Sequence, residues 1–152
     1  MEFQNERQIA DRAKQILGGK LRSRAETFKQ HVSNNSASIK DVEAVTSVRN
    51  YNKDGVTKSY FNKLSIRMGK HGFIQNFGVD TQRRGGVRKR KKPRSISYNF
   101  TAHYFRIKAT PFINEAIAES NVIPFVLENV MKVRMEGFYL ETRNILTRPS
   151  SS

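Results

Sequence analysis

The stretch that decides the fold runs from Val42 to Met68 and reads VEAVTSVRNYNKDGVTKSYFNKLSIRM. It contains two runs of recurring apolar residues, and in the second run they fall largely at every other position, as in a β-strand. The apolar residues are Val42, Val45 and Val48 in the first run, and Tyr60, Leu64, Ile66 and Met68 in the second. The turn-forming residues 52–55, Asn-Lys-Asp-Gly, separate the two runs. The stretch therefore predicts an antiparallel hairpin, with a connecting loop longer than two residues.

Helical periodicity precedes this hairpin. Apolar residues follow one another mostly in steps of three and four at Ile9, Ala13, Ile16, Leu17, Leu21, Ala25, Phe28 and Val32. Gly18 and Gly19 interrupt the pattern, and each glycine costs a helix about 1 kcal/mol relative to alanine. The N-terminal third is therefore predicted to be helical, either as one helix that bends at the glycines or as two helices that meet there.

Helical periodicity also follows the hairpin, towards the C-terminus. Thr110 is suited to an N-cap and Pro111 to the first position of a helix. The predicted buried stripe of this helix consists of Phe112, Ile113, Ala116 and Ile117. The same spacing continues beyond Pro124, which either starts a further helix or kinks the first one.

Between these parts the sequence predicts a short helical turn and a third strand. Phe73, Ile74 and Phe77 are spaced as on one helical turn, which Gly78 would cap. Apolar and polar residues alternate from Ile96 to Tyr104. The chain is thus predicted to be α+β: a small, mainly antiparallel sheet with a long N-terminal helix and C-terminal helices packed on it. We expect a single domain over residues 1–152, with a basic loop over 80–95, a flexible tail over 147–152, and Phe73, Phe77 and Phe112 in the core.

The composition restricts the possible functions. The chain of 152 residues has 28 Lys and Arg against 13 Asp and Glu, a net charge of +15, and it contains no cysteine. Disulfides and thiolate metal sites are therefore excluded, and no apolar run is long enough to predict a membrane span. The three histidines lie far apart in sequence and no catalytic motif is present. We expect neither enzymatic activity nor a cofactor or metal.

A dense cationic run lies in the second half. Eight of the twelve residues from Arg83 to Arg94 are basic and none is acidic. The basic residues are Arg83, Arg84, Arg88, Lys89, Arg90, Lys91, Lys92 and Arg94. Like charges at this density cannot be buried without partners, which indicates a projecting, solvated loop. Three interpretations stay open: a purely solvated loop, contact with acidic faces of neighbouring proteins, or contact with nucleic-acid phosphates without reading sequence.

Two short motifs resemble those of a known family. The aromatic turn Gly72–Gly78 reads GFIQNFG, and after a polar loop the segment Pro111–Ala116 reads PFINEA. Their order resembles the tail-completion proteins of tailed bacteriophages, also called head-to-tail joining or neck proteins. In that family a turn ending in Phe-Gly-Thr precedes a loop, and Pro-Phe-Leu-x-Pro-Ala starts the last helix. Here Val79 replaces the usual Thr, and Asn114-Glu115-Ala116 replaces Arg-Pro-Ala.

The resemblance implies a structural role in the virion. Such proteins form closed rings, commonly of six subunits, that join the capsid portal to the tail around the DNA channel. The implied partners are further copies of the chain and other neck, portal and tail proteins, and the implied site of assembly is the host bacterial cytoplasm. The implied assembly and packing motif consists of Phe73, Phe77, Gly78, Pro111 and Phe112. The alternative, from the charge alone, is a nucleic-acid-binding protein that uses the basic loop without sequence specificity.

Overall fold

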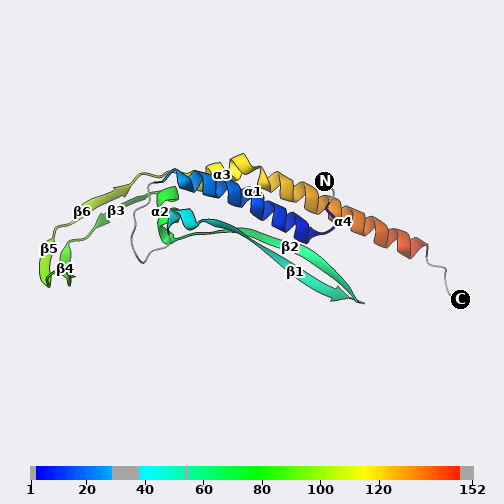
Figure 1. Cartoon of the computed structure of the whole chain (residues 1–152), viewed down its shortest axis with the longest axis horizontal. Coiled ribbons are helices and arrows are strands. Elements are labelled where there is room, and N and C mark those ends of the chain that lie inside the picture. The colour runs from blue at the N-terminus through cyan, green and yellow to red at the C-terminus, as the bar shows by residue number, and fades with distance from the viewer. Residues whose placement is uncertain (1–2, 29–37, 54, 148–152) are drawn as a thin grey trace. The chain divides into compact units, whose positions relative to one another are not determined.

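The computed structural model describes residues 3–28, 38–53 and 55–147 (Figure 1). The chain forms two compact units, one from residues 1–69 and 112–152 and the other from Lys70–Pro111. Helices and antiparallel strands occur in both, so the α+β prediction is confirmed. Of the predicted N-terminal helix pattern, Val32 lies outside the described residues, as does the predicted tail beyond Thr147.

The first unit begins with one long helix. Helix α1 spans Glu6–Glu26, and the Asn5 side chain caps it by accepting a hydrogen bond from the Gln8 amide at 3.0 Å. The helix continues through Gly18 and Gly19, so the prediction of two helices does not apply. A Cβ atom on the buried Gly18 would lie 3.8 Å from the Ala44 Cβ, so this turn of the helix packs closely against the following strand.

The predicted hairpin is confirmed, but its turn is tighter than expected. Strand β1 spans Glu43–Lys53 and strand β2 spans Val56–Arg67. They pair antiparallel from Glu43 opposite Arg67 to Lys53 opposite Val56, with one register shift between Ser47 and Val48. The connection is therefore only residues 54–55, where Gly55 adopts the left-handed φ of 78° that favours glycine. The short 3₁₀ helix η1 (Ile39–Asp41) precedes β1.

Two helices close the first unit. Helix α3 spans Phe112–Ser120 and helix α4 spans Val122–Leu146. Asn121 between them has a left-handed φ of 49°, which separates the two helices. Pro124 is the third residue of α4, so of the two predicted alternatives it starts a further helix. Pro111 lies immediately before α3 and is not its first residue.

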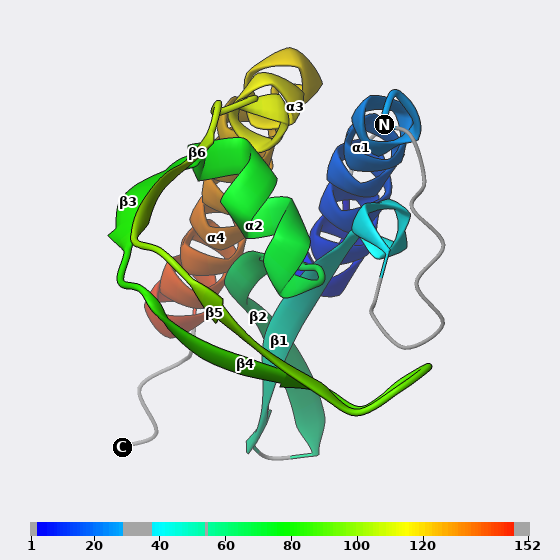
Figure 2. The same ribbon diagram turned by 90° about the vertical axis from the view of Figure 1, so that its left-hand side faces the viewer.

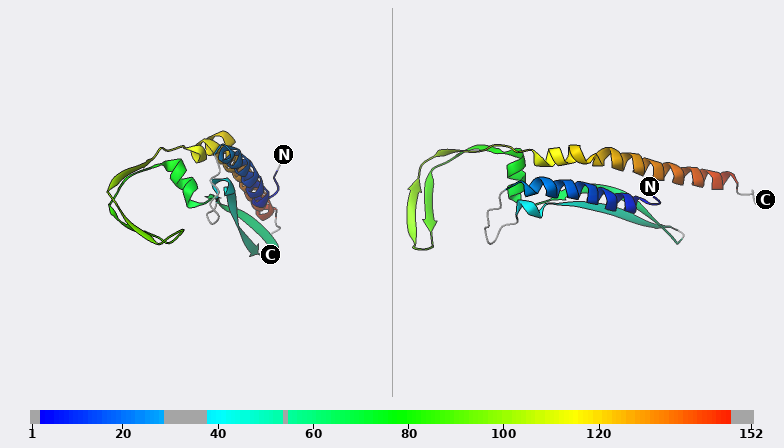
Figure 3. Two further views of the ribbon diagram at one scale, coloured as in Figure 1. Left: turned by 60° about the vertical axis from the view of Figure 1, so that its left-hand side comes forward. Right: turned by 45° about the horizontal axis from the view of Figure 1, so that its top comes forward.

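The core of this unit is built around α1. Figures 1 and 3 show α1 between the β1–β2 hairpin on one side and α3 and α4 on the other. Figure 2 shows the same layers along the helix axes. The buried apolar cluster consists of Ala13, Leu17, Leu21 and Ala25 from α1, with Val42, Ala44, Ala116 and Val122. Small residues on α1 let the hairpin and the helices approach it closely from both sides.

A buried carboxylate joins three elements of the first unit. Glu6, the first residue of α1, is only 2% exposed. Its carboxylate accepts a hydrogen bond from the Phe61 amide on β2 at 2.5 Å. It also accepts two bonds from the Arg134 guanidinium on α4, at 2.8 and 3.1 Å. These hydrogen bonds raise the pKa of Arg134. The burial of Glu6 is thus offset by three donors from two other elements.

The second unit contains one helix and two separate β-ribbons. Helix α2 spans Lys70–Phe77. Strand β3 (Val79–Arg83) pairs antiparallel with β6 (His103–Ile107), and β4 (Gly86–Arg90) pairs antiparallel with β5 (Ile96–Phe100). The predicted third strand is therefore split at residues 101–102, and it pairs with the basic segment instead of the hairpin. The sheet expected from three segments is replaced by three two-stranded ribbons.

The expectation of a loop over residues 80–95 is wrong in its local structure. Most of this segment lies in β3 and β4, and only residues 91–95 connect β4 to β5. High charge density excludes burial of the side chains, but it does not require an irregular backbone. A two-stranded ribbon satisfies half of its backbone groups across the strands and still leaves both faces in water, so its side chains can remain charged.

We expect Arg134→Ala to destabilise the protein by about 1–3 kcal/mol, because Glu6 would stay buried with only the Phe61 amide as donor. This is less than for a fully buried pair, since the Arg134 side chain is 54% exposed. The control is Lys132→Ala, which removes an exposed pair with Glu128 and should leave denaturant unfolding almost unchanged. Equal effects of the two substitutions would contradict the role assigned to Glu6.

Candidate functional site

One largely exposed part of the second unit is the arm, which we define as residues 79–107 with strands β3 to β6. Figure 3 shows that its two ribbons follow one another as a single curved arm. All five residues of β4 are exposed, as are four of the five in β3 and in β5. An isolated two-stranded ribbon is marginally stable at best in water. The arm therefore offers both faces to a partner and has little core of its own.

All eight cations predicted as contact residues lie on this arm and are exposed. Arg83 ends β3, Arg84 follows it, and Arg88, Lys89 and Arg90 belong to β4. Lys91, Lys92 and Arg94 lie in the connection to β5. Within the described part of the chain none of the eight forms an ion pair, and the arm's one ion pair joins Arg106 to Asp80 at 3.7 Å. The arm thus carries a concentrated positive charge without local neutralisation.

The strand register sorts the side chains of the β4–β5 ribbon onto two faces. Because directly paired residues share a face and alternate positions change face, one face carries both arginines and the aromatic rings. We call it the Arg-aromatic face: Arg88 opposite Tyr98, Arg90 opposite Ile96, and Phe100 opposite Gly86. The other face carries Lys89 opposite Ser97 and Val87 opposite Asn99. The alternation of apolar and polar residues from Ile96 to Phe100, which predicted a strand, thus belongs to a ribbon whose residues are mostly exposed.

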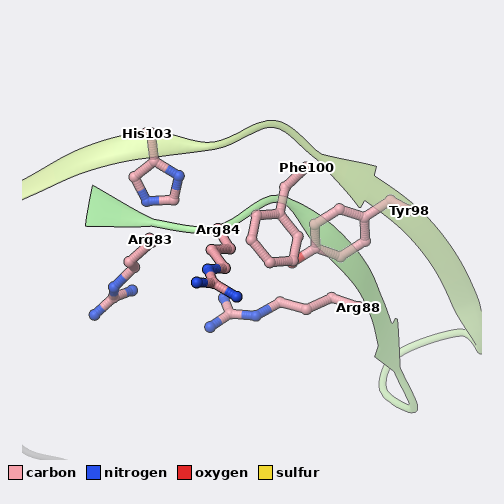
Figure 4. A pocket seen from close by; sticks show the side chains of 6 residues that line it. All are labelled: Arg83, Arg84, Arg88, Tyr98, Phe100 and His103. Carbon is pink, nitrogen blue, oxygen red and sulfur yellow. The ribbon is translucent and has the colours of Figure 1, made fainter. Parts of the chain in front are cut away.

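A hollow of about 470 Å³ lies at the base of this ribbon. Its lining residues are Arg83, Arg84, Arg88, Tyr98, Phe100 and His103 (Figure 4). The Arg88 guanidinium carbon lies 5.6 Å from the centre of the Phe100 ring, within cation–π range. The Arg83 guanidinium similarly lies 3.8 Å from the Phe105 ring centre. The rings hold the arginines while their donors stay available to an anion.

The chemistry of this hollow is anion binding. Guanidinium groups donate paired hydrogen bonds to phosphate or carboxylate oxygens. The Nδ1 atom of His103 lies 3.2 Å from the Thr101 carbonyl oxygen, within the arm itself. In the described ranges no three His, Asp or Glu side chains cluster as metal ligands do. The site is therefore best described as a cationic, aromatic surface.

The aromatic turn is helix α2, and its phenylalanines are not where the sequence placed them. Phe73 is 40% and Phe77 is 68% exposed, so the expectation that both are core residues is wrong. The buried positions of α2 are Gly72 and Asn76. Phe73 and Phe77, four residues apart, lie together on the exposed side of the helix. Phe112 is 3% exposed and stacks edge-on against Phe28 at 5.1 Å, so its core assignment is confirmed.

The structure joins the end of α2 to the segment that leads into α3. The Gly78 amide caps α2 by donating to the Ile74 carbonyl at 2.8 Å, and the φ of Gly78 is 73°. The Thr110 amide donates to the Gln75 carbonyl at 2.8 Å, and the Gln75 side chain donates to the Thr110 hydroxyl at 3.1 Å. Within the second unit, α2 is thus tied to Thr110, the residue before the exposed Pro111. Sequence reasoning missed Gln75, which carries no signal beyond its place inside the motif.

Helix α4 carries a second candidate surface that sequence reasoning also missed. Its apolar residues form two stripes, of which the one with Val122, Val126 and Val130 faces the core. The other stripe is more than half exposed at every position, and we call it the α4 apolar face: Ile123, Leu127, Met131, Met135, Phe138, Tyr139 and Leu146. Figure 1 shows α4 continuing beyond the N-terminal end of α1. The signal available in the sequence was the four-residue spacing from Ile123 to Met135.

No family model, curated protein or solved structure matches this chain. None of the described helices is long and apolar enough to cross a membrane.

We expect Gly78→Ala to destabilise the second unit more than Gly55→Ala destabilises the hairpin. Both glycines have a left-handed φ, which costs other residues roughly 1–2 kcal/mol. At Gly78 the new Cβ would also lie 2.7 Å from the Ile107 carbonyl oxygen, whereas at Gly55 it would meet open space. Hydrogen exchange of the Thr110 amide measures the local loss of stability in each variant, and thermal unfolding measures the loss for the whole chain. Equal protection of Thr110 in both variants would contradict the assigned close contact.

Phe112→Ala should destabilise the protein by about 3–5 kcal/mol, because it removes a buried ring from the first unit. The matched control is Phe77→Ala, which removes an exposed ring of the same size and should change the free energy of unfolding by about 0.5 kcal/mol or less. Urea denaturation of both variants measures this. A larger loss for Phe77→Ala than for Phe112→Ala would reverse the assignment of core and surface.

Proposed function

We propose that this chain is a structural subunit of a tailed-phage virion, and that copies of it form a ring that joins the head portal to the tail around the DNA channel. The observation that carries the proposal is the arm, an ordered β-structure with almost no residues buried. A segment of this kind is useful only when something outside its own unit covers it. The proposed role is structural and not catalytic.

The arm has the reach for a contact with a neighbouring subunit. Strands β3 and β4 with their link cover residues 79–90. At about 3.3 Å per residue, twelve residues in extended conformation span roughly 40 Å. That distance is comparable to the diameter of a small domain. An arm of this length suits a protein whose neighbours lie on either side of it in a ring.

The α4 apolar face supplies a second surface suited to assembly. Its seven large side chains are each between 57% and 79% exposed. One partner of a stable interface of standard size contributes about 800 Å², and a row of exposed large apolar side chains is the kind of surface that fills the centre of such an interface. Because the arm and α4 are different elements, each can meet a different surface of a neighbour. Such head-to-tail contacts generate closed rings.

The family resemblance supports the same role. The short aromatic helix α2 with its left-handed glycine cap comes before helix α3, which starts after Pro111, and this is the order of the two motifs on which the resemblance rests. The hydrogen bonds between Gln75 and Thr110 hold the aromatic turn to the residue that precedes Pro111, within the second unit. We propose a hexamer, with portal, neck and tail proteins as its partners, assembled in the host bacterial cytoplasm.

The test is the mass of the purified full-length chain at low salt and at about 1 M salt, where charge pairs are screened within about 3 Å. A discrete oligomer that survives high salt is expected from apolar contacts. Met135→Glu combined with Phe138→Glu should leave the helical circular dichroism unchanged and reduce the oligomer to monomers. Arg143→Glu, which places a carboxylate at an exposed position outside the α4 apolar face, is the control and should still assemble.

A chain that is monomeric at every concentration and salt level would contradict the proposed ring. The alternative function, a nucleic-acid-binding protein that acts alone, predicts that monomer. Loss of assembly in the Arg143→Glu control as well would show that charge in general, and not the α4 apolar face, governs association.

A further inference from the structure

We infer that the Arg-aromatic face of the β4–β5 ribbon, together with the hollow at its base, binds the phosphodiester backbone of nucleic acid. The inference goes beyond ring formation and does not depend on it, because the face is complete within one chain. The residues that carry it are Arg84, Arg88 and Arg90 as phosphate donors, with Tyr98 and Phe100 as the rings beside them.

Charge sets the class of ligand. Eight cations lie between Arg83 and Arg94 with no acidic residue among them, in a chain whose net charge is +15. All eight are exposed, and within the described residues none has an ion-pair partner. Several unneutralised cations on a narrow ribbon create a positive potential that attracts a polyanion over many ångströms. The ligand must therefore carry several negative charges in a row.

The rings distinguish nucleic acid from acidic protein. An acidic peptide would use the arginines and lysines, but its carboxylate side chains offer no aromatic ring to stack on Tyr98 and Phe100. A nucleic-acid strand offers both phosphates and base faces, and interleaved cations and aromatic rings are typical of surfaces that bind it. Here the register sets Arg88 directly opposite Tyr98, and the Arg88 guanidinium lies 5.6 Å from the Phe100 ring centre.

The spacing of the cations also suits a phosphodiester chain. Arg88 and Arg90 are two residues apart on one strand, so they project from the same face about 6.7 Å apart. Two phosphate steps along one strand of DNA advance by about 6.8 Å. The hollow adds Arg83 and Arg84 at the base of the ribbon, which extends the cationic track in the same direction. No helix presents these side chains to a groove, so binding should be independent of sequence.

The experiment measures binding of the full-length chain to a fluorescently labelled DNA duplex of mixed sequence and to one of its single strands, across a range of salt concentrations. If about six cations meet phosphates, the log–log slope of affinity against salt should be near −5 for the duplex. Arg88→Ser with Arg90→Ser should flatten that slope by about 2. The control, Arg7→Ser with Arg22→Ser on exposed positions of α1, makes the same change in net charge and should leave the slope unchanged.

A further double variant tests the role of the two rings, by comparing its binding to single-stranded DNA with its binding to the duplex. Tyr98→Ala with Phe100→Ala should weaken single-strand binding by roughly 30-fold or more, because two unpaired bases each lose a stacking partner. Duplex binding should change much less, since its bases are already stacked. Equal loss for both forms of DNA would overturn the assigned stacking role.

Two further outcomes would overturn the inference. One is competition by polyglutamate as strong as that by DNA of equal charge, with no effect of the ring substitutions, which would assign the face to acidic protein. The other is an equal change of slope in the α1 control, which would assign binding to net charge alone. All substituted side chains except Phe100 are exposed, so thermal unfolding of the variants should confirm an intact first unit. Failure of DNA binding and failure of ring formation can be told apart, because a monomer can bind DNA through this face.

Discussion

The first unit depends on one buried charge. Glu6 is almost inaccessible to water, and its carboxylate is satisfied by the Phe61 amide and by two nitrogens of Arg134. A carboxylate in that position fixes the start of α1 against both β2 and α4, since none of the three can move away without leaving it unsatisfied. It also fixes the rotation of α4 about its axis. One apolar stripe of α4 is thereby turned to the core, and the other is left for solvent or a neighbour.

The two units are stabilised by different interactions. The first buries small apolar side chains of α1 between a hairpin and two helices. The second buries little, and its short helix is held by a glycine cap and by the hydrogen bonds between Gln75 and Thr110. In a protein that combines a firm body with a sparsely packed arm, the arm is the part that costs least to rearrange on binding. This division of roles suits an assembly subunit, in which the body sets position and the arm adapts to what it meets.

Periodicity predicted the elements that bury one face. The spacing from Ile9 to Ala25 gave α1, and the alternation between Tyr60 and Met68 gave β2, because burial imposes those periods. It failed where burial is absent: the basic segment forms strands without an apolar pattern, and Phe73 and Phe77 have helical spacing yet face outward. Glu6 and Arg134 could not be paired from sequence, since they are 128 positions apart and charged residues are common in surface helices. Each cation of the site could be identified from the sequence. That the arginines and the aromatic rings share one face follows only from the strand register.

The first unit is discontinuous in the chain, and this has a consequence for how the protein folds. Its core combines residues that precede Lys70 with residues that follow Pro111. The core is therefore incomplete until α3 and α4 have left the ribosome. The contacts that complete the core have a large sequence separation, which slows folding because a long loop must close first. The ribbons of the arm join residues close in sequence and can form early. During synthesis the ribbons of the arm leave the ribosome before α3 and α4, and the side of α1 that these two helices cover stays exposed until they follow.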